Sequence, residues 1–500
     1  MKKSLLVRHS LSSKIFNIIL VSFIFSFYTF AGGSLDNNKN FKTLKSFKAD
    51  PIVTNQQCLS CHKDEDPGLT ADWQHSKHAT AGVGCVQCHV VPKDYPNAFK
   101  DHPFTGKNWT IQVAVSSVTC AQCHEKEVDE YLASGHSRGG AQWLAENGNA
   151  HGVAMTKLAY GYEAMQGGKG ISHDFLLNKG KSETDLTVSN ICIQCHGTVI
   201  KLDDSGKPLA STWPNDGIAS LYPDGGVGNC LSCHSRHKFS AAEARQPASC
   251  GNCHLGPDHP DKEIFESSVH GHIFDTNEED YDFSTGAQVP GKNLRAATCY
   301  TCHMSGINLL QPTHNVSLRL KWNLWAPKSF ERTGKSETAG WAWWNNKKVI
   351  RGNPKAGNPN GAEAAREDME QVCSACHKTT FIDNYFARVD QDVLLYNQYR
   401  DEGQKMFNEL KAKKLIKKDL WSDPFFKLSY YLWHHEGRRM RQGAAMGSPD
   451  FAHWHGVFQV MQDIREMKDI YNYRLRRLKE LKDPQEVLDS EPPMPVVTHE

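Results

Sequence analysis

The sequence shows no excess of charge of either sign. It contains 57 Lys and Arg residues against 56 Asp and Glu residues, a formal net charge of +1. A balance of this kind gives no electrostatic reason to expect nucleic acid or an acidic membrane surface as a partner. We therefore expect the chain to bind no nucleic acid.

Apolar residues are sparse for a chain of this length. They make up 39% of the 500 residues, and the mean hydropathy is −0.56. A chain this long has room for a sizeable core or for several domains. The low apolar content therefore predicts that a group other than side chains fills part of the interior.

Long apolar runs are absent after residue 31. Met1–Lys14 carries four basic residues and no acidic one, Ile15–Ala31 is apolar, and Gly32–Gly33 follow. This is the order of a secretory signal, so residues 1–31 are predicted to be a signal peptide. The protein is then expected to be exported to the periplasm or an equivalent compartment, and to be soluble after cleavage. An uncleaved anchor is the alternative, because the run of seventeen residues could nearly span a bilayer.

No cysteine stands outside one short motif. All sixteen belong to C-x-x-C-H segments, in which two thiols attach one haem and the adjacent histidine binds its iron. Disulfide bonds, the default in an exported protein, and zinc sites are the alternatives, and the complete use of cysteine in this motif argues against both. The sequence predicts eight covalently bound c haems. The motif residues are Cys58, Cys61 and His62; Cys85, Cys88 and His89; Cys120, Cys123 and His124; Cys192, Cys195 and His196; Cys230, Cys233 and His234; Cys250, Cys253 and His254; Cys299, Cys302 and His303; and Cys373, Cys376 and His377.

The spacing of the motifs is irregular, so the chain is not a repeat array. Turn signals crowd the haem region, strand patterns are scarce, and helical periodicity with dense charge follows Lys378. Helices are predicted over 384–418, 425–441 and 457–482. The expected fold is mainly α, a multihaem cytochrome c with a loop-rich haem core over residues 32–380 and long helices over 381–500.

Histidines outside the motifs outnumber the iron positions that they could fill. Eight of the 25 histidines are motif residues, which leaves seventeen for at most eight sixth positions. Lone histidines in short turns near the motifs are the expected distal ligands, namely His78, His102, His136, His237, His270 and His314. At least two of His434, His435, His453 and His455 are expected to contact haem or its propionates, with His455 counted among the iron ligands and a surface or core position as the alternative. For His9, His173 and His499 we expect no such role.

The segment LGPDHP follows the sixth motif directly and places Asp258 and His259 on a turn. An iron with two histidine ligands transfers electrons but has no position for substrate. An enzyme needs one iron with an open face and a proton donor near it, and an adjacent acid and imidazole suit that role. The alternative is a turn aspartate beside a further distal ligand, His259.

The order of the eight motifs, together with CGNCHLGPDH, QPTHNVS and WHHEGRRMRQGAAMGSPDFAHWHG, resembles the octahaem hydroxylamine oxidoreductase family from about Cys58 to Gly456. The resemblance implies a homotrimer of mostly helical subunits with seven bis-histidine haems. It also implies that the haem held by Cys192, Cys195 and His196 is five-coordinate and catalytic. Asp258 and His259 would handle protons above this haem, and residues 381–500 would complete haem ligation and the trimer contacts.

The chain departs from the family pattern at Phe451. Members that oxidise hydroxylamine or hydrazine have at this position a tyrosine that bonds covalently to the neighbouring subunit's catalytic porphyrin. Phenylalanine has no phenolic oxygen, so we expect an unlinked haem and a reductive reaction on nitrite, nitric oxide or hydroxylamine, with a small c-type cytochrome as redox partner. The alternatives are hydroxylamine or hydrazine oxidation and a non-catalytic electron carrier. Phe451 itself could also be a packing residue that says nothing about direction.

Overall fold

The computed structural model describes residues 35, 38–138, 194–332 and 357–492. The predicted signal peptide 1–31 lies outside these ranges, as do Cys192, His9, His173 and His499. Among the described residues, no helix has the length and apolar character needed to cross a membrane.

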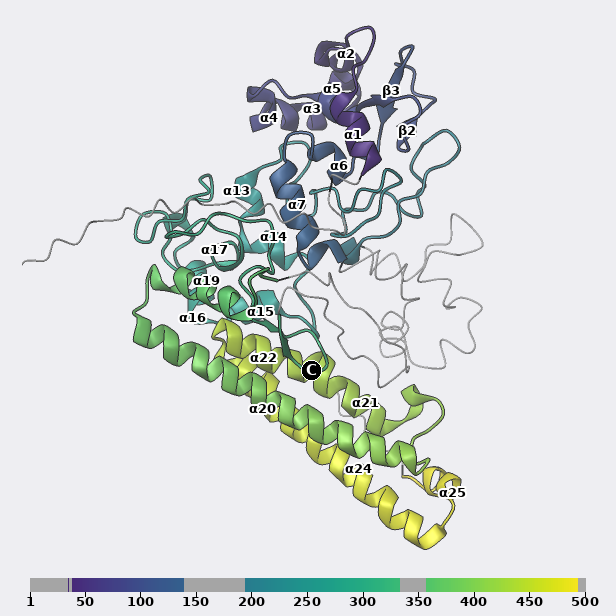
Figure 1. Ribbon diagram of the computed structural model, residues 1–500, viewed down its shortest axis with the longest axis vertical. Helices are drawn as coiled ribbons and strands as arrows, with labels where there is room; N and C mark the ends of the chain where they lie inside the picture. The colour runs from purple at the N-terminus through teal and green to yellow at the C-terminus, as the bar shows by residue number, and fades with distance from the viewer. Residues whose placement is uncertain (1–34, 36–37, 139–193, 333–356, 493–500) are drawn as a thin grey trace, which may run out of the picture.

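The part of the chain that carries the motifs consists of short helices joined by loops, as predicted (Figure 1). The α-helices are α1 Lys39–Ser46, α2 Asn55–Glu65, α3 Pro67–Gln74, α4 Lys77–Thr80, α5 Cys85–His89, α6 Ser117–Cys120, α7 Glu125–Ala133, α13 Ala241–Ala244, α14 Pro247–Gly251, α15 Asp261–Glu266, α16 Val269–Asp275, α17 Cys299–His303 and α19 Ala362–Ser374. Three short 3₁₀ turns are η2 His136–Arg138, η3 Glu278–Asp280 and η4 Leu420–Ser422.

Each described motif forms about one turn of helix. The backbone N–H of the motif histidine donates to the carbonyl of the first cysteine, at 2.9 Å for His124 and 3.0 Å for His234. Cysteines three residues apart then lie on the same face of the turn. The C-x-x-C spacing therefore aims both thiols toward one group, with the histidine ring next to them.

Strands are few and short in the described ranges. The strands β1 Val90–Pro92, β2 Ala98–Phe99 and β3 Trp109–Gln112 form an antiparallel sheet in the order β1-β3-β2. A second antiparallel pair joins β4 Trp322–Asn323 to β5 Phe330–Glu331. The prediction of a mainly α fold is confirmed.

Long helices fill the C-terminal part (Figure 1). They are α20 Thr379–Ala412, α21 Pro424–Tyr431, α22 Gly437–Met446, α23 Pro449–Ala452, α24 Gln459–Leu481 and α25 Pro484–Asp489. The predicted helices over 384–418 and 457–482 correspond to α20 and α24. The one predicted over 425–441 is interrupted, because Leu432–Glu436 forms a π-helical turn between α21 and α22. A second π-helical turn, His453–Phe458, precedes α24.

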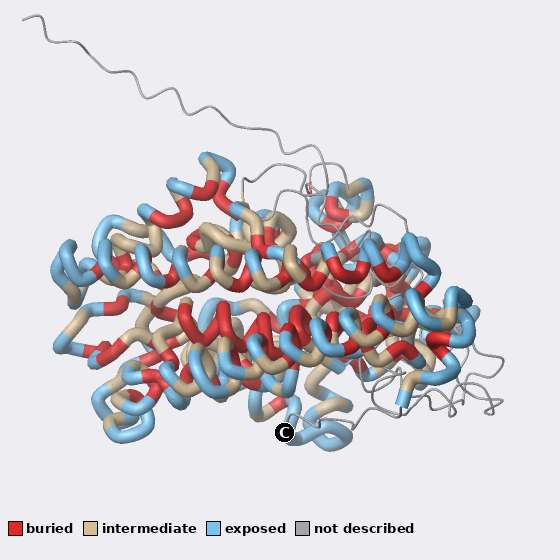
Figure 2. The backbone as a smooth tube through the Cα atoms, turned by 90° about the horizontal axis from the view of Figure 1, so that it is seen from below, coloured by how far each residue is buried: buried red, intermediate tan, exposed pale blue. Residues whose placement is uncertain are grey.

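The main hydrophobic core lies between these C-terminal helices, and Figure 2 shows buried residues gathered along their facing sides. It includes Phe407, Phe425, Phe426 and Trp433, each at most 1% exposed. Burying aromatic side chains of this size contributes roughly 1.5–3 kcal/mol each. The core therefore gives the region that follows the haem motifs an apolar interior of its own.

A buried ion-pair cluster joins α24 to the residues around it. Arg474 of α24 is fully buried and lies 3.1 Å from Asp423, which is also fully buried and caps α21. Its other guanidinium nitrogen lies 2.9 Å from Glu491. The two carboxylates compensate the buried guanidinium, as a buried charge requires.

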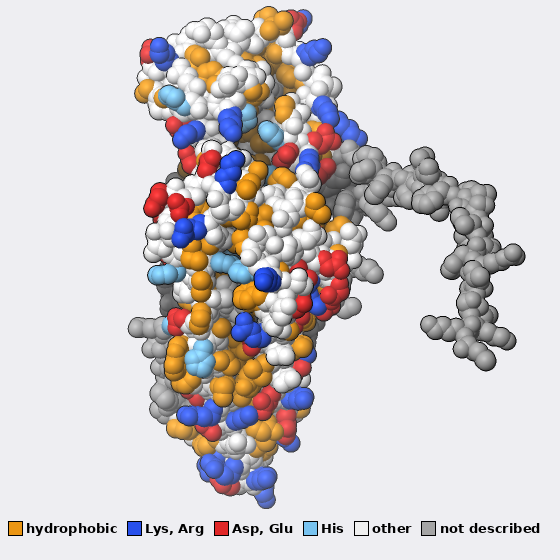
Figure 3. Space-filling view, turned by 90° about the vertical axis from the view of Figure 1, so that its left-hand side faces the viewer, with side chains coloured by type: hydrophobic (Ala, Val, Ile, Leu, Met, Phe, Trp, Pro, Cys, Tyr) orange, Lys and Arg blue, Asp and Glu red, His pale blue; other side chains and the backbone are white. Residues whose placement is uncertain are grey.

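Hydrophobic side chains also gather on part of the surface (Figure 3). The exposed large apolar residues between 379 and 461 are Phe381, Leu394, Trp454, Phe458 and Met461. The trimer contacts predicted for residues 381–500 stay a prediction.

Candidate haem sites and active site

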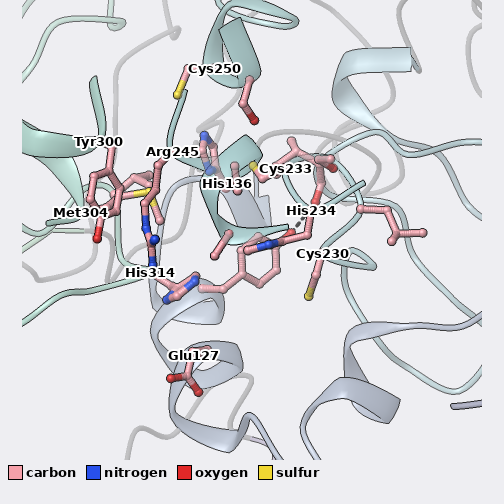
Figure 4. Close-up of a pocket in the computed structure, with 18 of the residues that line it drawn as sticks. Glu127, His136, Cys230, Cys233, His234, Arg245, Cys250, Tyr300, Met304 and His314 are labelled. Atoms are coloured by element: carbon pink, nitrogen blue, oxygen red, sulfur yellow. Dashed lines mark hydrogen bonds between the residues drawn. The ribbon is translucent and has the colours of Figure 1, made fainter. Parts of the chain in front are cut away.

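A continuous cavity of about 2760 Å³ runs through the part of the chain that carries the motifs. All eight motifs contribute residues to its walls. Figure 4 shows one part of it, with Cys230, Cys233 and His234 of the fifth motif around the same space as His314. A cavity of this size lined by thiols and imidazoles fits several covalently attached porphyrins, which agrees with the sparse apolar composition of the chain.

Five motif histidines each have the ring of a histidine from outside the motifs nearby. Imidazole–metal bonds of about 2.0 Å place two rings on opposite faces of one metal ion with centres roughly 6.3 Å apart. The measured ring-centre distances are 6.5 Å for His62 and His102, 6.4 Å for His89 and His237, 6.1 Å for His124 and His78, 6.0 Å for His254 and His136, and 6.2 Å for His377 and His270. In each pair the non-motif ring belongs to a predicted distal ligand. These ten residues could therefore hold five irons between paired imidazoles.

A sixth pair consists of His234 and His314. Both side chains line the same part of the cavity (Figure 4). Burial lowers the pKa of His234 to about 4, and the charge of His314 is the next cause. The backbone N–H of His314 donates to Glu130 Oε2 at 2.8 Å and fixes the loop that carries it. All six turn histidines predicted as distal ligands thus lie near a motif histidine.

Burial keeps two of the distal imidazoles, those of His136 and His237, neutral at neutral pH. Burial lowers the pKa of His136 to about 3 and the pKa of His237 to about 4. A metal binds the unprotonated imidazole nitrogen. The burial of these rings therefore keeps them in the form that ligates iron.

Several motif histidines use Nδ1 for a hydrogen bond within the protein. His89 Nδ1 lies 2.8 Å from the carbonyl oxygen of Gln112, and His254 Nδ1 lies 2.7 Å from Asp261 Oδ2. His62 Nδ1 lies 2.8 Å from Asp66 Oδ2. A hydrogen bond at Nδ1 fixes the ring and leaves Nε2 for the metal.

The fourth motif lies against the sixth. Cys195 Sγ is 3.9 Å from the carbonyl oxygen of Asn252. A hydrogen bond with Cys253 lowers the pKa of the Cys195 thiol against the opposing effect of burial, and the charges of His259 and His254 lower it further. The turn that carries His259 is therefore next to the motif of Cys195 and His196.

Asp258 and His259 form a closely coupled pair. His259 Nδ1 lies 2.6 Å from Asp258 Oδ1, and its Nε2 lies 2.9 Å from the carbonyl oxygen of Cys253. Both partners are acceptors, so the two hydrogen bonds form together only when both ring nitrogens carry a proton. The ring packs on Trp325 with 5.2 Å between centres. The pair can hold a proton beside the fourth motif.

Side chains of helix α22 and of the π-helical turn before it contact the Asp258–His259 turn. Arg438 Nη1 lies 3.2 Å from Asp258 Oδ2, and its guanidinium lies over the rings of Trp325 and Trp433, 5.1 and 5.0 Å from their centres. Arg439 Nε donates to the carbonyl oxygen of Pro257 at 2.9 Å. Sequence reasoning missed both arginines, although they belong to the WHHEGRR segment that carried part of the resemblance.

The segment around Phe451 lies beside α15 and α22. Ser448 Oγ is 2.8 Å from Ser267 Oγ, and the half-buried Phe451 ring packs against His455, 5.2 Å between centres. His455 Nδ1 lies 3.1 Å from Asp450 Oδ2. Within the described ranges no motif histidine is in ring contact with His455, so its role as an iron ligand stays a prediction.

Two family models match the chain. Residues 224–349 match the model described as seven times multi-haem cytochrome CxxCH, and residues 28–90 match the model for cytochrome c554 and c-prime. Together they cover the first and several later motifs.

Two curated proteins are similar in sequence. A probable nitrite reductase-hydroxylamine oxidoreductase fusion protein of Kuenenia stuttgartiensis is 26% identical over 407 residues, which cover 75% of this chain and 40% of that protein. Multiheme cytochrome MtrA of Shewanella baltica is 25% identical over 208 residues, which cover 36% of this chain and 56% of that protein. The chain thus spans only part of the length of each relative.

Two solved structures have the same fold. A hypothetical multiheme protein superposes with a TM-score of 0.63 at 24% identity, over 89% of this chain and 99% of that one. A reducing HAO-like protein complex of Kuenenia stuttgartiensis gives a TM-score of 0.54 at 21% identity over 86% of each chain.

The motifs, their paired histidines and these matches define the chain as a multihaem cytochrome c with covalently bound haem. Within that class it is similar in sequence to a protein named as a nitrite reductase-hydroxylamine oxidoreductase fusion, and it shares its fold with a reducing HAO-like complex.

Proposed function

We propose that the chain is a reductase of small nitrogen compounds, acting on nitrite, nitric oxide or hydroxylamine at a five-coordinate haem held by Cys192, Cys195 and His196. The observation that carries the proposal is the coupled pair Asp258 and His259, which lies against the fourth motif. The printed names of the relatives, a nitrite reductase-hydroxylamine oxidoreductase fusion and a reducing HAO-like complex, support the same substrate class.

The other seven of eight c haems would carry electrons. The six histidine pairs support this part of the proposal, because two imidazoles on one iron leave no position for a substrate. A small c-type cytochrome would supply the electrons, and the protein would work as a homotrimer in an extracytoplasmic compartment.

When bound, the haem supplies an iron that binds the nitrogen atom of the substrate and passes electrons to it. The protein's own residues supply the protons. The ring nitrogens of His259 lie 2.6 Å from Asp258 Oδ1 and 2.9 Å from the carbonyl oxygen of Cys253, and the ring packs against Trp325, which orients it. Arg438 fixes the Asp258 carboxylate from the opposite side, so acid and imidazole keep their relative geometry as protons are delivered.

Phe451 supports the reductive direction. Its side chain has no oxygen with which to form a bond to a porphyrin, and it packs against His455. We expect the haem peptide of the fourth motif, analysed by mass spectrometry, to have the mass of its residues plus one haem. An additional peptide attached to that haem would contradict the reductive assignment.

Two measurements on the haem-loaded protein test the proposal. A high-spin ferric signal that accounts for one haem in eight would support the open site, whereas eight low-spin haems would leave only an electron carrier. Reduced viologen should be oxidised when nitrite or hydroxylamine is added. Faster turnover of hydroxylamine with an oxidised acceptor than with reduced viologen would overturn the direction.

A further inference from the structure

We propose that protons reach Asp258 through the C-terminal helices, from Glu466 at the surface by way of Asp463 and the π-helical turn Leu432–Glu436. The inference rests on the proposed function, since it supplies the protons that a reduction at the fourth motif consumes. Reduction of hydroxylamine shows the balance: two electrons from the partner cytochrome and two protons break the N–O bond and give ammonia and water. Asp258 is only 9% exposed, so those protons need a route through the protein.

His434 forms the inner end of the route. It is fully buried, and its Nε2 lies 3.7 Å from Asp258 Oδ2. A separation slightly beyond hydrogen-bond range is closed by a small side-chain movement or by one water. The ring stacks on Tyr430 with 4.6 Å between centres and an interplanar angle of 18°, and meets Trp433 edge-on at 4.7 Å. These contacts hold His434 in an orientation that faces Asp258.

The π-helical turn continues the route away from the site. It places His434, His435 and Glu436 in succession, and the rings of the two histidines are 5.3 Å apart. Glu436 is fully buried. Single π-helical turns inside α-helices frequently occur at functional sites. The turn therefore contains three successive side chains that can each bind and release a proton.

Asp463 of α24 connects this turn to the outside. It is fully buried, and α24 packs against the π-helical turn. Burial raises the pKa of Tyr431, and the charges of Glu436 and Asp463 raise it further. The turn that carries Glu436 and the helix that carries Asp463 are therefore in contact, and both carboxyl groups are fully buried.

The electrostatics suit a proton relay. Burial raises the pKa of Asp463 well above its usual range, with Glu466 as the second cause. The raised pKa favours the protonated form of Asp463, which can pass its proton inward. Glu466 lies three residues further along α24, is half-buried, and can take a replacement proton from solvent. On the inner side Arg439 Nε donates to the carbonyl oxygen of Pro257 at 2.9 Å, so its positive charge lies beside the segment that carries Asp258.

The test measures proton uptake in the haem-loaded protein after rapid photochemical reduction, with a pH-indicator dye and without nitrogen substrate. Asp463→Asn replaces a protonated carboxyl by a neutral group of the same shape, and His434→Gln removes the imidazole at the other end. Each should slow proton uptake about a hundredfold, the lower end of what a positioned general acid contributes. The final number of protons taken up and the haem spectra should not change.

Asp469→Asn is the matched control, because Asp469 is an exposed carboxylate on the same helix. Uptake at the wild-type rate in both route variants would overturn the route, as would equal slowing by the control. Infrared difference spectra give a second reading, since the carbonyl band of a protonated carboxyl should vanish in Asp463→Asn alone. Slowed uptake in a protein that reduces no nitrogen compound would refute the proposed function and leave the route standing.

Discussion

Asp258 and His259 face one another across 2.6 Å, and Arg438 holds the same carboxylate from the other side at 3.2 Å. Arg438, 180 positions away in the sequence, thus fixes the position of the adjacent residues Asp258 and His259. The acid–imidazole pair is rigid because a separate helix supports it, and its geometry does not depend on the turn alone.

Replacing Asp258 by Asn should lower the rate of hydroxylamine or nitrite reduction by about 10²–10³-fold, because the amide cannot pass on a proton. Steady-state assays with reduced viologen measure this. Glu266→Gln, an exposed carboxylate on the neighbouring helix α15, should keep the wild-type rate. A similar rate for Asp258→Asn and wild type would rule out this aspartate as a proton donor.

Replacing His102 by Ala should leave a second haem iron with an open axial position. His102 lies 6.5 Å from His62 between ring centres, so its loss removes one of two axial imidazoles. Electron paramagnetic resonance of the ferric protein should show one additional high-spin haem per chain, which added imidazole converts back to low spin. His75→Ala, at an exposed histidine of the same region, should change nothing. An unchanged spin state in His102→Ala would remove this pair from the ligand set.

Asp463→Asn should make the protein more stable, and the gain should grow with pH. The pKa of Asp463 is raised in the folded state above its usual 3.8, so the folded form binds this proton more tightly than the unfolded form. The resulting stabilisation is complete below about pH 4 and is lost as pH rises towards the folded-state pKa. Within that window the loss amounts to about 1.4 kcal/mol per pH unit. Urea unfolding at pH 4 and pH 8 compares the two proteins; a constant difference would show that Asp463 is not the titrating group.

Arg474→Met should destabilise the C-terminal helices by about 3–5 kcal/mol, because it leaves the fully buried Asp423 without its cation. The midpoint of urea unfolding, followed by far-ultraviolet circular dichroism, measures the loss. Arg477→Met on the same helix replaces an arginine that is paired with Glu480 on a partly exposed face and should cost less than about 1 kcal/mol. Equal losses of unfolding free energy in the two variants would show that the buried ion-pair cluster contributes no more to stability than an exposed pair.

The haem attachment sites could be predicted from the sequence because covalent chemistry fixes their spacing. Two thiols three residues apart and the following histidine form a local pattern, and each described motif folds into one helical turn. The distal candidates were predictable for a related reason, since His78 and His102 are lone histidines close to motifs in the sequence. The structure places His78 in the short helix α4 and not in a turn. Which motif histidine each one faces was not predictable, since His237 faces His89 from 148 positions away.

The support of the acid–imidazole pair could not be predicted, because no local pattern connects residue 258 with residue 438. The break between α21 and α22 was missed for a different reason. Helical periodicity continues through Leu432–Glu436, and one additional residue in the turn changes the hydrogen-bond ladder without adding Pro or Gly. A pattern with period 3.6 cannot reveal such a turn over five residues.

The π-helical turn Leu432–Glu436 limits the insertions that this part of the chain can tolerate. An α-helix rotates by about 100° per residue, and the turn already contains one additional residue, so insertion of a further residue into Leu432–Glu436 would turn the helix that follows by about that angle. Arg438 and Arg439 would then point away from Pro257 and Asp258. Loops of the haem region can absorb insertions and deletions, whereas an insertion in Leu432–Glu436 reorients α22. A library of length variants should therefore show that insertions in this turn are not tolerated.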